Sequence, residues 1–191
     1  MGMNPLTIHT GDSLTVLRTL ESESVQCCVT SPPYWGLRDY GVDGQIGQED
    51  TPEIFVQVMV EIFREVRRVL KKDGTCWVNL GDSYASGGRK SYDHDAKLPA
   101  RKNQTRPGSD LKPKDLVGIP WMVAFALRAD GWFLRQDIIW SKPNPMPESV
   151  TDRCTKSHEY IFLLSKSASY YYDHAAIKTP IKETRDRKSV V

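Results

Sequence analysis

Thr30-Ser31-Pro32-Pro33-Tyr34-Trp35 directly follows a short apolar run and decides how this chain is interpreted. Two consecutive prolines fix φ and lack backbone N–H groups, so this stretch does not continue a helix or a strand ladder. The carbonyls of Ser31 and Pro32 can therefore accept hydrogen bonds from a substrate. Such acceptors suit a site that receives protons from an amine. The rings of Tyr34 and Trp35 can stack on a flat substrate such as a nucleobase. The stretch therefore predicts chemistry on an exocyclic amino group.

Short apolar runs alternate with amphipathic segments on both sides of this turn, which is typical of an α/β protein with a parallel sheet. Thr51-Pro52-Glu53 is a helix start with proline at the first position. Lys71-Lys72-Asp73-Gly74 is expected to end that helix with cations and a glycine. The predicted strands cover residues 6–10, 25–30, 75–80, 132–140 and 159–165, and the other predicted helices start at Ser13 and cover residues 113–129.

The composition is typical of a globular protein with one hydrophobic core. A chain of 191 residues with 39% hydrophobic residues can bury one core, most simply as a single domain. The net charge of +2 argues only weakly for a polyanionic partner. Four cysteines without a Cys-x-x-Cys pair are interpreted as small core residues of a reduced protein, so no metal site is expected. No apolar run is long enough to span a bilayer and no signal peptide is visible, which predicts a cytoplasmic location without membrane partners.

Residues 81–113 are rich in Gly, Ser, Lys, Arg and Asp and contain almost no apolar side chain. Such a segment buries too little surface to offset its ordering entropy, which predicts a mobile surface loop. A compatible interpretation is that its cations contact phosphates and that the loop orders on DNA. These cations are Arg89, Lys90, Lys97, Arg101, Lys102 and Arg106.

Five segments carry a resemblance that spans almost the whole chain. They are Gly11-Asp12-Ser13, Ser31-Pro32-Pro33-Tyr34 and residues 77–84, 139–145 and 158–165. In this order they resemble the DNA amino-methyltransferases of the N4-cytosine and N6-adenine type, in the subgroup whose catalytic motif precedes its cofactor motif. The resemblance implies a Rossmann-like fold dependent on S-adenosylmethionine, with a mostly parallel sheet and an antiparallel final pair. The serine form of the motif is more often found in N4-cytosine enzymes.

The resemblance assigns catalysis to Ser31, Pro32, Pro33 and Tyr34. If the Ser31 side chain and the Pro32 carbonyl accept the two amino hydrogens, the nitrogen lone pair points at an electrophilic methyl group. Tyr34 would stack on the flipped base. Trp35 is a further candidate for contact with the substrate.

Four polar residues and one arginine complete the candidate site. The resemblance implies that Asp12 reaches the adenine amino group of S-adenosylmethionine, although Asp followed by Ser is also an ordinary helix start. Asp82, Lys142 and Asn144 lie at strand ends, where α/β sheets bind ligands, and are candidates for DNA contact. Turn geometry is the competing explanation for these three. Arg38 is a further candidate for DNA contact.

The sequence departs from the family in one respect. Related enzymes continue into a glycine-rich Phe-x-Gly-x-Gly turn that holds the methionine end of the cofactor, and no such turn follows a strand here. We therefore expect residues 1–177 to be the catalytic half of a methyltransferase domain, and residues 178–191 to be a polar tail leading to a missing cofactor half. The missing strands would lie between the strands at 6–10 and 25–30. A fragment, a truncated gene, a split enzyme and a rearranged sheet all remain open.

The predicted function is transfer of a methyl group from S-adenosylmethionine to N4 of a flipped cytosine in double-stranded DNA, within a restriction-modification system. N6-adenine methylation is one alternative, and a catalytically silent DNA-binding or assembly subunit of a split enzyme is another. A similar fold acting on RNA or protein is a third, which Ser31 disfavours. A second polypeptide carrying the glycine-rich turn is an expected partner, and unpaired strand edges favour a homodimer.

Overall fold

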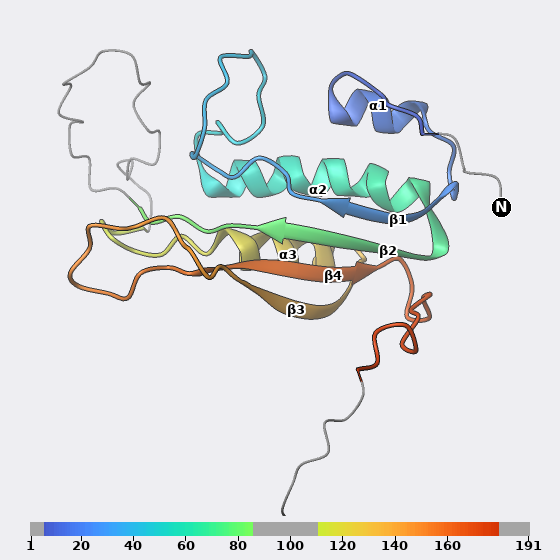
Figure 1. The fold of residues 1–191 in the computed structure, drawn as a ribbon. Coiled ribbons are helices and arrows are strands. Elements are labelled where there is room, and N and C mark those ends of the chain that lie inside the picture. Colours follow the sequence, from blue (N-terminus) through green and yellow to red (C-terminus); the bar gives the residue numbers. More distant parts are fainter. Residues whose placement is uncertain (1–5, 86–110, 180–191) are drawn as a thin grey trace, which may run out of the picture.

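The computed structural model describes residues 6–85 and 111–179. The six cations assigned to phosphate contact, Arg89 to Arg106, lie outside the described residues. Figure 1 shows helices packed along a twisted sheet. In chain order the elements are α1 (Ser13–Thr19), β1 (Val25–Thr30), α2 (Pro52–Val69), β2 (Leu70–Leu80), α3 (Ile119–Ala129), β3 (Phe133–Ser141) and β4 (His158–Ser165).

The described strands form one mixed sheet in the order β1-β2-β4-β3. β1 runs parallel to β2, whereas β4 is antiparallel to both β2 and β3. The predicted α/β class and the antiparallel final pair are therefore confirmed. The sheet is not mostly parallel in the described residues, because β4 inserts between β2 and β3 and makes two of the three pairings antiparallel.

The strand predicted at residues 6–10 is wrong. These residues have no regular secondary structure, and Leu6 and Ile8 are almost fully exposed. A strand needs a hydrogen-bonding neighbour, and β1 pairs only with β2 among the described strands. The helix predicted after Ser13 is present as α1, although it buries none of its residues.

α2 begins as the sequence predicts. The Thr51 side chain accepts a hydrogen bond from the Ile54 N–H, and Pro52 occupies the first turn. The helix ends at Val69, however, and residues 71–74 belong to β2. Leu70 is fully buried and pairs with Val25, so the backbone becomes extended as soon as the helix ends. The apolar face of α2 is buried through Phe55, Met59, Phe63, Val66 and Val69.

α3 begins six residues later than the predicted helix at 113–129. Gly118 precedes it with φ of 83°, a left-handed conformation that prevents the helix from extending toward its N-terminus. α3 contacts α2, and both helices pack on the same face of the sheet (Figure 1). No helix in the described ranges 6–85 and 111–179 is long and apolar enough to cross a membrane.

The two faces of the sheet differ in how they are covered. Side chains on a strand point alternately to opposite faces. Cys76, Val78 and Leu80 of β2 point into the core beneath α2 and α3. Asn79 therefore points to the opposite face, close to the point where β1 gives way to the turn at Ser31.

Candidate active site

The Tyr34 hydroxyl connects the turn after β1 to the ends of two other strands. Its oxygen lies 2.9 Å from Asn79 Oδ1 on β2 and 3.0 Å from Glu159 Oε2 on β4. Ser31 Oγ lies 3.3 Å from Asn79 Oδ1 and 3.5 Å from the Tyr34 hydroxyl. The structure thus brings the predicted Ser31 and Tyr34 together with Asn79 and Glu159. We call these four residues the Tyr34 network.

Two contacts fix which atoms face Tyr34. Asn79 Nδ2 donates to the Tyr160 carbonyl at 3.2 Å, which turns Oδ1 toward Tyr34. Glu159 Oε1 pairs with the Lys142 ammonium, which leaves Oε2 for the Tyr34 hydroxyl. Burial raises the pKa of Glu159, but hydrogen bonds from Lys142 and Tyr34 outweigh it and hold this pKa below its usual value. The carboxylate is therefore charged at neutral pH.

Gly81 leaves room for the ring of Tyr34. A Cβ atom built on Gly81 would lie 2.5 Å from Cε2 and 2.9 Å from Cδ2 of that ring, closer than any real carbon contact. Gly81 is buried, and the Tyr34 hydroxyl is held at the far end of the ring. Only glycine at position 81 is compatible with this position of Tyr34.

A family model described as DNA methylase matches residues 25–190, which includes every residue of the Tyr34 network. The chain belongs to this DNA methylase family. Its similarity to the type II methyltransferase M.Cfr9I of Citrobacter freundii is 58% identity over 178 residues. That match covers 92% of this chain but 59% of M.Cfr9I.

Two solved structures share the fold of this chain. TTHA0409 of Thermus thermophilus, solved in complex with S-adenosyl-L-methionine, superposes with a TM-score of 0.58 at 23% identity, over 86% of this chain and 55% of that one. The PvuII DNA methyltransferase, named as cytosine-N4-specific, superposes with a TM-score of 0.60 at 19% identity, over 88% of this chain and 53% of that one. Both matches confirm the expected methyltransferase fold.

We expect Gly81→Ala to destabilise the fold by about 1–3 kcal/mol, the usual cost of overpacking. Urea unfolding of Gly81→Ala, Tyr34→Ala and the double variant measures this cost. The alanine methyl should cost much less in the Tyr34→Ala background, because the ring that it meets is gone. Equal costs in the two backgrounds would show that Gly81 is needed for another reason.

The pKa of the Tyr34 hydroxyl is raised well above its ordinary value. Burial, aided by the neighbouring Glu159, raises the pKa of Tyr34 to about 12. A raised pKa in the folded state stabilises the fold below the ordinary tyrosine pKa of about 10, and this stability is lost as the pH rises toward 12. We expect the stability of the wild type relative to Tyr34→Phe to be constant below about pH 9 and to fall above about pH 10, measured by urea unfolding. A pH-independent difference would contradict the shift.

Trp35 is not a stacking partner for a substrate in this structure. Its side chain is 7% exposed and packs in the core, where Nε1 donates to the Glu49 carbonyl at 2.9 Å. The sequence predicted that both aromatic rings lie at the surface of the turn. In the structure the backbone after Pro33 directs the Trp35 side chain into the core instead. Arg38 is exposed on the following loop, and its carbonyl accepts from the Gln45 and Gln48 amides.

Both predicted aspartates cap helices. Asp82 Oδ1 accepts from the N–H groups of Ser83, Gly118 and Ile119, which fixes the start of α3. This arrangement favours turn geometry as the role of Asp82. Asp12 Oδ1 accepts from the Thr15 N–H and hydroxyl, each at 2.8 Å, and these bonds lower the Asp12 pKa.

The two candidates after β3 have different surroundings. Lys142 forms the ion pair with Glu159, so its ammonium belongs to the site. Asn144 lies exposed in the loop that follows. It takes no part in the contacts of the Tyr34 network described above.

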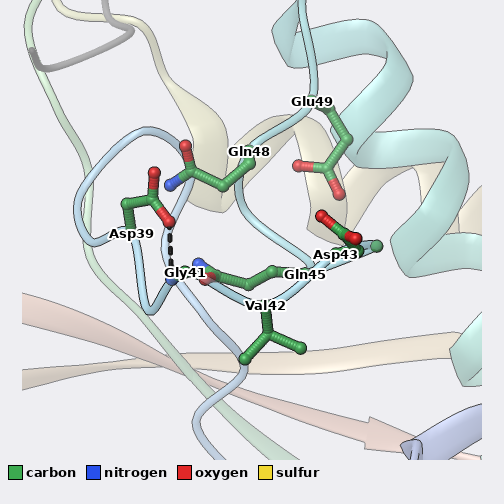
Figure 2. Close-up of a pocket in the computed structure, with 8 residues that line it drawn as sticks. Asp39, Gly41, Val42, Asp43, Gln45, Gln48 and Glu49 are labelled. Atoms are coloured by element: carbon green, nitrogen blue, oxygen red, sulfur yellow. Dashed lines mark hydrogen bonds between the residues drawn. The ribbon is translucent and has the colours of Figure 1, made fainter. Parts of the chain in front are cut away.

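A hollow in the loop after Trp35 is separate from the Tyr34 network. Figure 2 shows carboxylates and amides around it, including the hydrogen bond from the Gly41 N–H to Asp39. Carboxylates repel phosphate, so this hollow is electrostatically unsuited to a nucleic-acid backbone. Its lining comprises Asp39, Gly41, Val42, Asp43, Gly44, Gln45, Gln48 and Glu49.

Proposed function

We propose that this chain carries the catalytic segment of an enzyme that transfers a methyl group from S-adenosylmethionine to N4 of cytosine in double-stranded DNA. One observation carries the proposal. The exposed Ser31 hydroxyl follows the end of β1 and lies near a tyrosine whose hydroxyl contacts residues of two other strands, and Pro32 is the next residue in the chain. Membership of the DNA methylase family supports this reading of the turn.

The Ser31 hydroxyl is suited to accept a hydrogen bond from an amino group. Asn79 Oδ1 lies 3.3 Å from Ser31 Oγ and can take the serine's own proton, because an amide oxygen is an acceptor only. The lone pairs of Oγ are then directed away from Asn79. An amino group that donates one hydrogen to Ser31 and the other to Pro32 loses conjugation with its ring, so its lone pair becomes nucleophilic. S-adenosylmethionine, when bound, supplies the electrophilic methyl group.

The residues near α1 fit one end of this cofactor. Thr15 uses only Oδ1 of Asp12, and the carboxylate is exposed. Oδ2 is therefore suited to accept a hydrogen bond from the amino group of an adenine ring. The low pKa of Asp12 keeps the carboxylate charged for this role. We propose Asp12 as the residue of this chain that holds the adenosine end.

The remaining cofactor contacts are proposed to come from a further segment. The chain spans 59% of the length of M.Cfr9I, and β1 lies at the outer position of the described sheet. We propose that residues 1–177 form the catalytic half of the domain and that residues 178–191 lead toward the cofactor half. Strands of that half would pair with the open side of β1.

Identification of the methylated nucleoside tests the function. The chain is incubated with duplex DNA and labelled S-adenosylmethionine, alone and together with the part of M.Cfr9I that lies beyond the match. Labelled N4-methylcytosine after digestion is the expected product. N6-methyladenine would move the assignment to the alternative base. DNA binding without any methylated product under both conditions would support a catalytically silent subunit instead.

The cytosine assignment rests on position 31. Ser31 occupies the first place of the motif, the form that the resemblance links more often to N4-cytosine enzymes. The PvuII enzyme that shares this fold is named cytosine-N4-specific. A role beside a restriction enzyme is proposed because M.Cfr9I is a type II methyltransferase.

A further inference from the structure

Glu159 is a site residue that has no role in the interpretation of the sequence. It lies at the start of β4, 125 positions from Tyr34 in the chain, yet its Oε2 is 3.0 Å from the Tyr34 hydroxyl. Its side chain is 18% exposed. A partly buried carboxylate is costly unless its oxygens are paired, and here each oxygen has its own partner, Lys142 and Tyr34.

We propose that Glu159, held by Lys142, is a positioning residue that sets the orientation of the Tyr34 ring against the flipped base. This inference rests on the proposed function, because a positioned ring matters only if a base stacks on it. Glu159 touches neither base nor cofactor in this account and acts only through Tyr34.

The position of the Tyr34 ring depends on its hydroxyl contacts and on Gly81. The hydroxyl lies on the long axis of the ring, so its close contacts with Asn79 Oδ1 and Glu159 Oε2 fix the direction of this axis. They leave rotation about the axis free. Gly81 leaves the space that the Cδ2 and Cε2 edge of the ring occupies, because a Cβ at this position would lie 2.5 Å from Cε2. The hydroxyl contacts thus direct the ring, and the absence of a side chain at Gly81 permits the position that they set.

The charge of Glu159 distinguishes it from Asn79. Tyr34 has one hydroxyl proton and two acceptors within 3.0 Å, and a carboxylate attracts that proton more strongly than an amide oxygen does. The Tyr34 proton is therefore directed at Glu159, while the Ser31 proton is left for Asn79. Lys142 keeps the carboxylate charged and turned in this direction. Loss of Glu159 should release the ring and also redistribute both protons.

A misdirected ring should slow the chemical step more than it weakens DNA binding. DNA affinity depends mainly on phosphate contacts, which Glu159 does not make. Small misplacement of a positioning group costs up to about 10²-fold in rate. We expect Glu159→Ala to lower kcat about tenfold, with KM for DNA changed by less than about twofold.

Four variants test the proposal: Glu159→Ala, Glu159→Gln, Tyr34→Phe and the double variant Tyr34→Phe/Glu159→Ala. NMR titration of tyrosines labelled at Cζ gives the Tyr34 pKa, with Tyr34→Phe assigning the signal. We expect this pKa to fall in Glu159→Ala and also in Glu159→Gln, which keeps the side-chain shape but removes the charge. We expect the double variant to have the kcat of Tyr34→Phe, because Glu159 acts only through the hydroxyl.

Glu148→Ala is the matched control. Glu148 is also a partly buried glutamate in an ion pair, with Arg153 at 2.6 Å, and it makes no contact with Tyr34. This variant should change neither the Tyr34 pKa nor kcat. A Tyr34 pKa unchanged by Glu159→Ala overturns the proposal, and so do kcat losses that multiply in the double variant. A wild type that methylates no DNA even with the further segment of M.Cfr9I supplied defeats the proposed function instead, while the titration still decides whether Glu159 holds Tyr34.

Discussion

Ser31→Ala is expected to lower the rate of methyl transfer by about 10²- to 10³-fold, the usual cost of removing one preorganised polar contact to the reacting group. The alanine removes Ser31 Oγ, one of the two acceptors proposed for the amino hydrogens. The Pro32 carbonyl then remains as the other acceptor. Because the Ser31 side chain is exposed, the substitution should leave the stability of the fold nearly unchanged. Single-turnover methylation by the chain combined with the part of M.Cfr9I beyond the match measures the rate of the chemical step directly.

Ser24→Ala provides a matched control at the opposite end of the same strand. Ser24 precedes β1, is exposed, and donates only to the nearby Glu21 carbonyl. The same chemical change there should leave the methylation rate within about twofold, as expected for a surface substitution. Similar losses in the two variants would show that Ser31 contributes through β1 rather than through the reacting amine.

Phe55→Ala is expected to destabilise the fold by about 3–5 kcal/mol, the range for a large aromatic side chain removed from a core. Phe55 is 0% exposed on α2 and belongs to the core cluster between the helices and the sheet. A loss of this size is a large fraction of the stability of a typical domain. Urea unfolding at a single temperature measures it through the midpoint and the slope.

The neighbouring residue supplies the control for Phe55. Ile54 precedes it on the same helix and is 43% exposed. Ile54→Ala should cost less than about 1 kcal/mol, because little apolar surface returns to water. If the two variants lost equal stability, α2 would not pack through the face that contains Phe55.

Local signals in the sequence predicted most of the elements. β1 has the predicted bounds, and α2 starts at the predicted proline, because apolar periodicity and capping act within a few residues. The errors arose where distant neighbours decide the outcome. Residues 6–10 have the composition of a strand but no paired partner, and residues 71–74 look like a helix end but continue into β2 beside β1.

The sequence predicted the motif residues of the candidate site but not the residues that contact them. Ser31 and Tyr34 were identified because their motif is local. Asn79 and Glu159 lie 45 and 125 positions from Tyr34 in the chain, and only the register of three strands brings them together. Gly81 was missed because its role depends on the empty space beside it. Sequence reasoning could have flagged all three as polar or glycine residues at strand ends inside motifs already quoted.

The outer side of β1, which has no paired strand among the described residues 6–85 and 111–179, also affects how this protein behaves in solution. Val29 is 79% exposed on this strand, and the backbone groups along an outer strand remain able to pair with another extended chain. Pairing between two molecules is second order, so it grows with the square of the protein concentration. Spectroscopic samples at high concentration and enzyme assays at low concentration would then contain different species. Light scattering across that range belongs with each measurement, because self-association could otherwise be mistaken for the effect of a substitution.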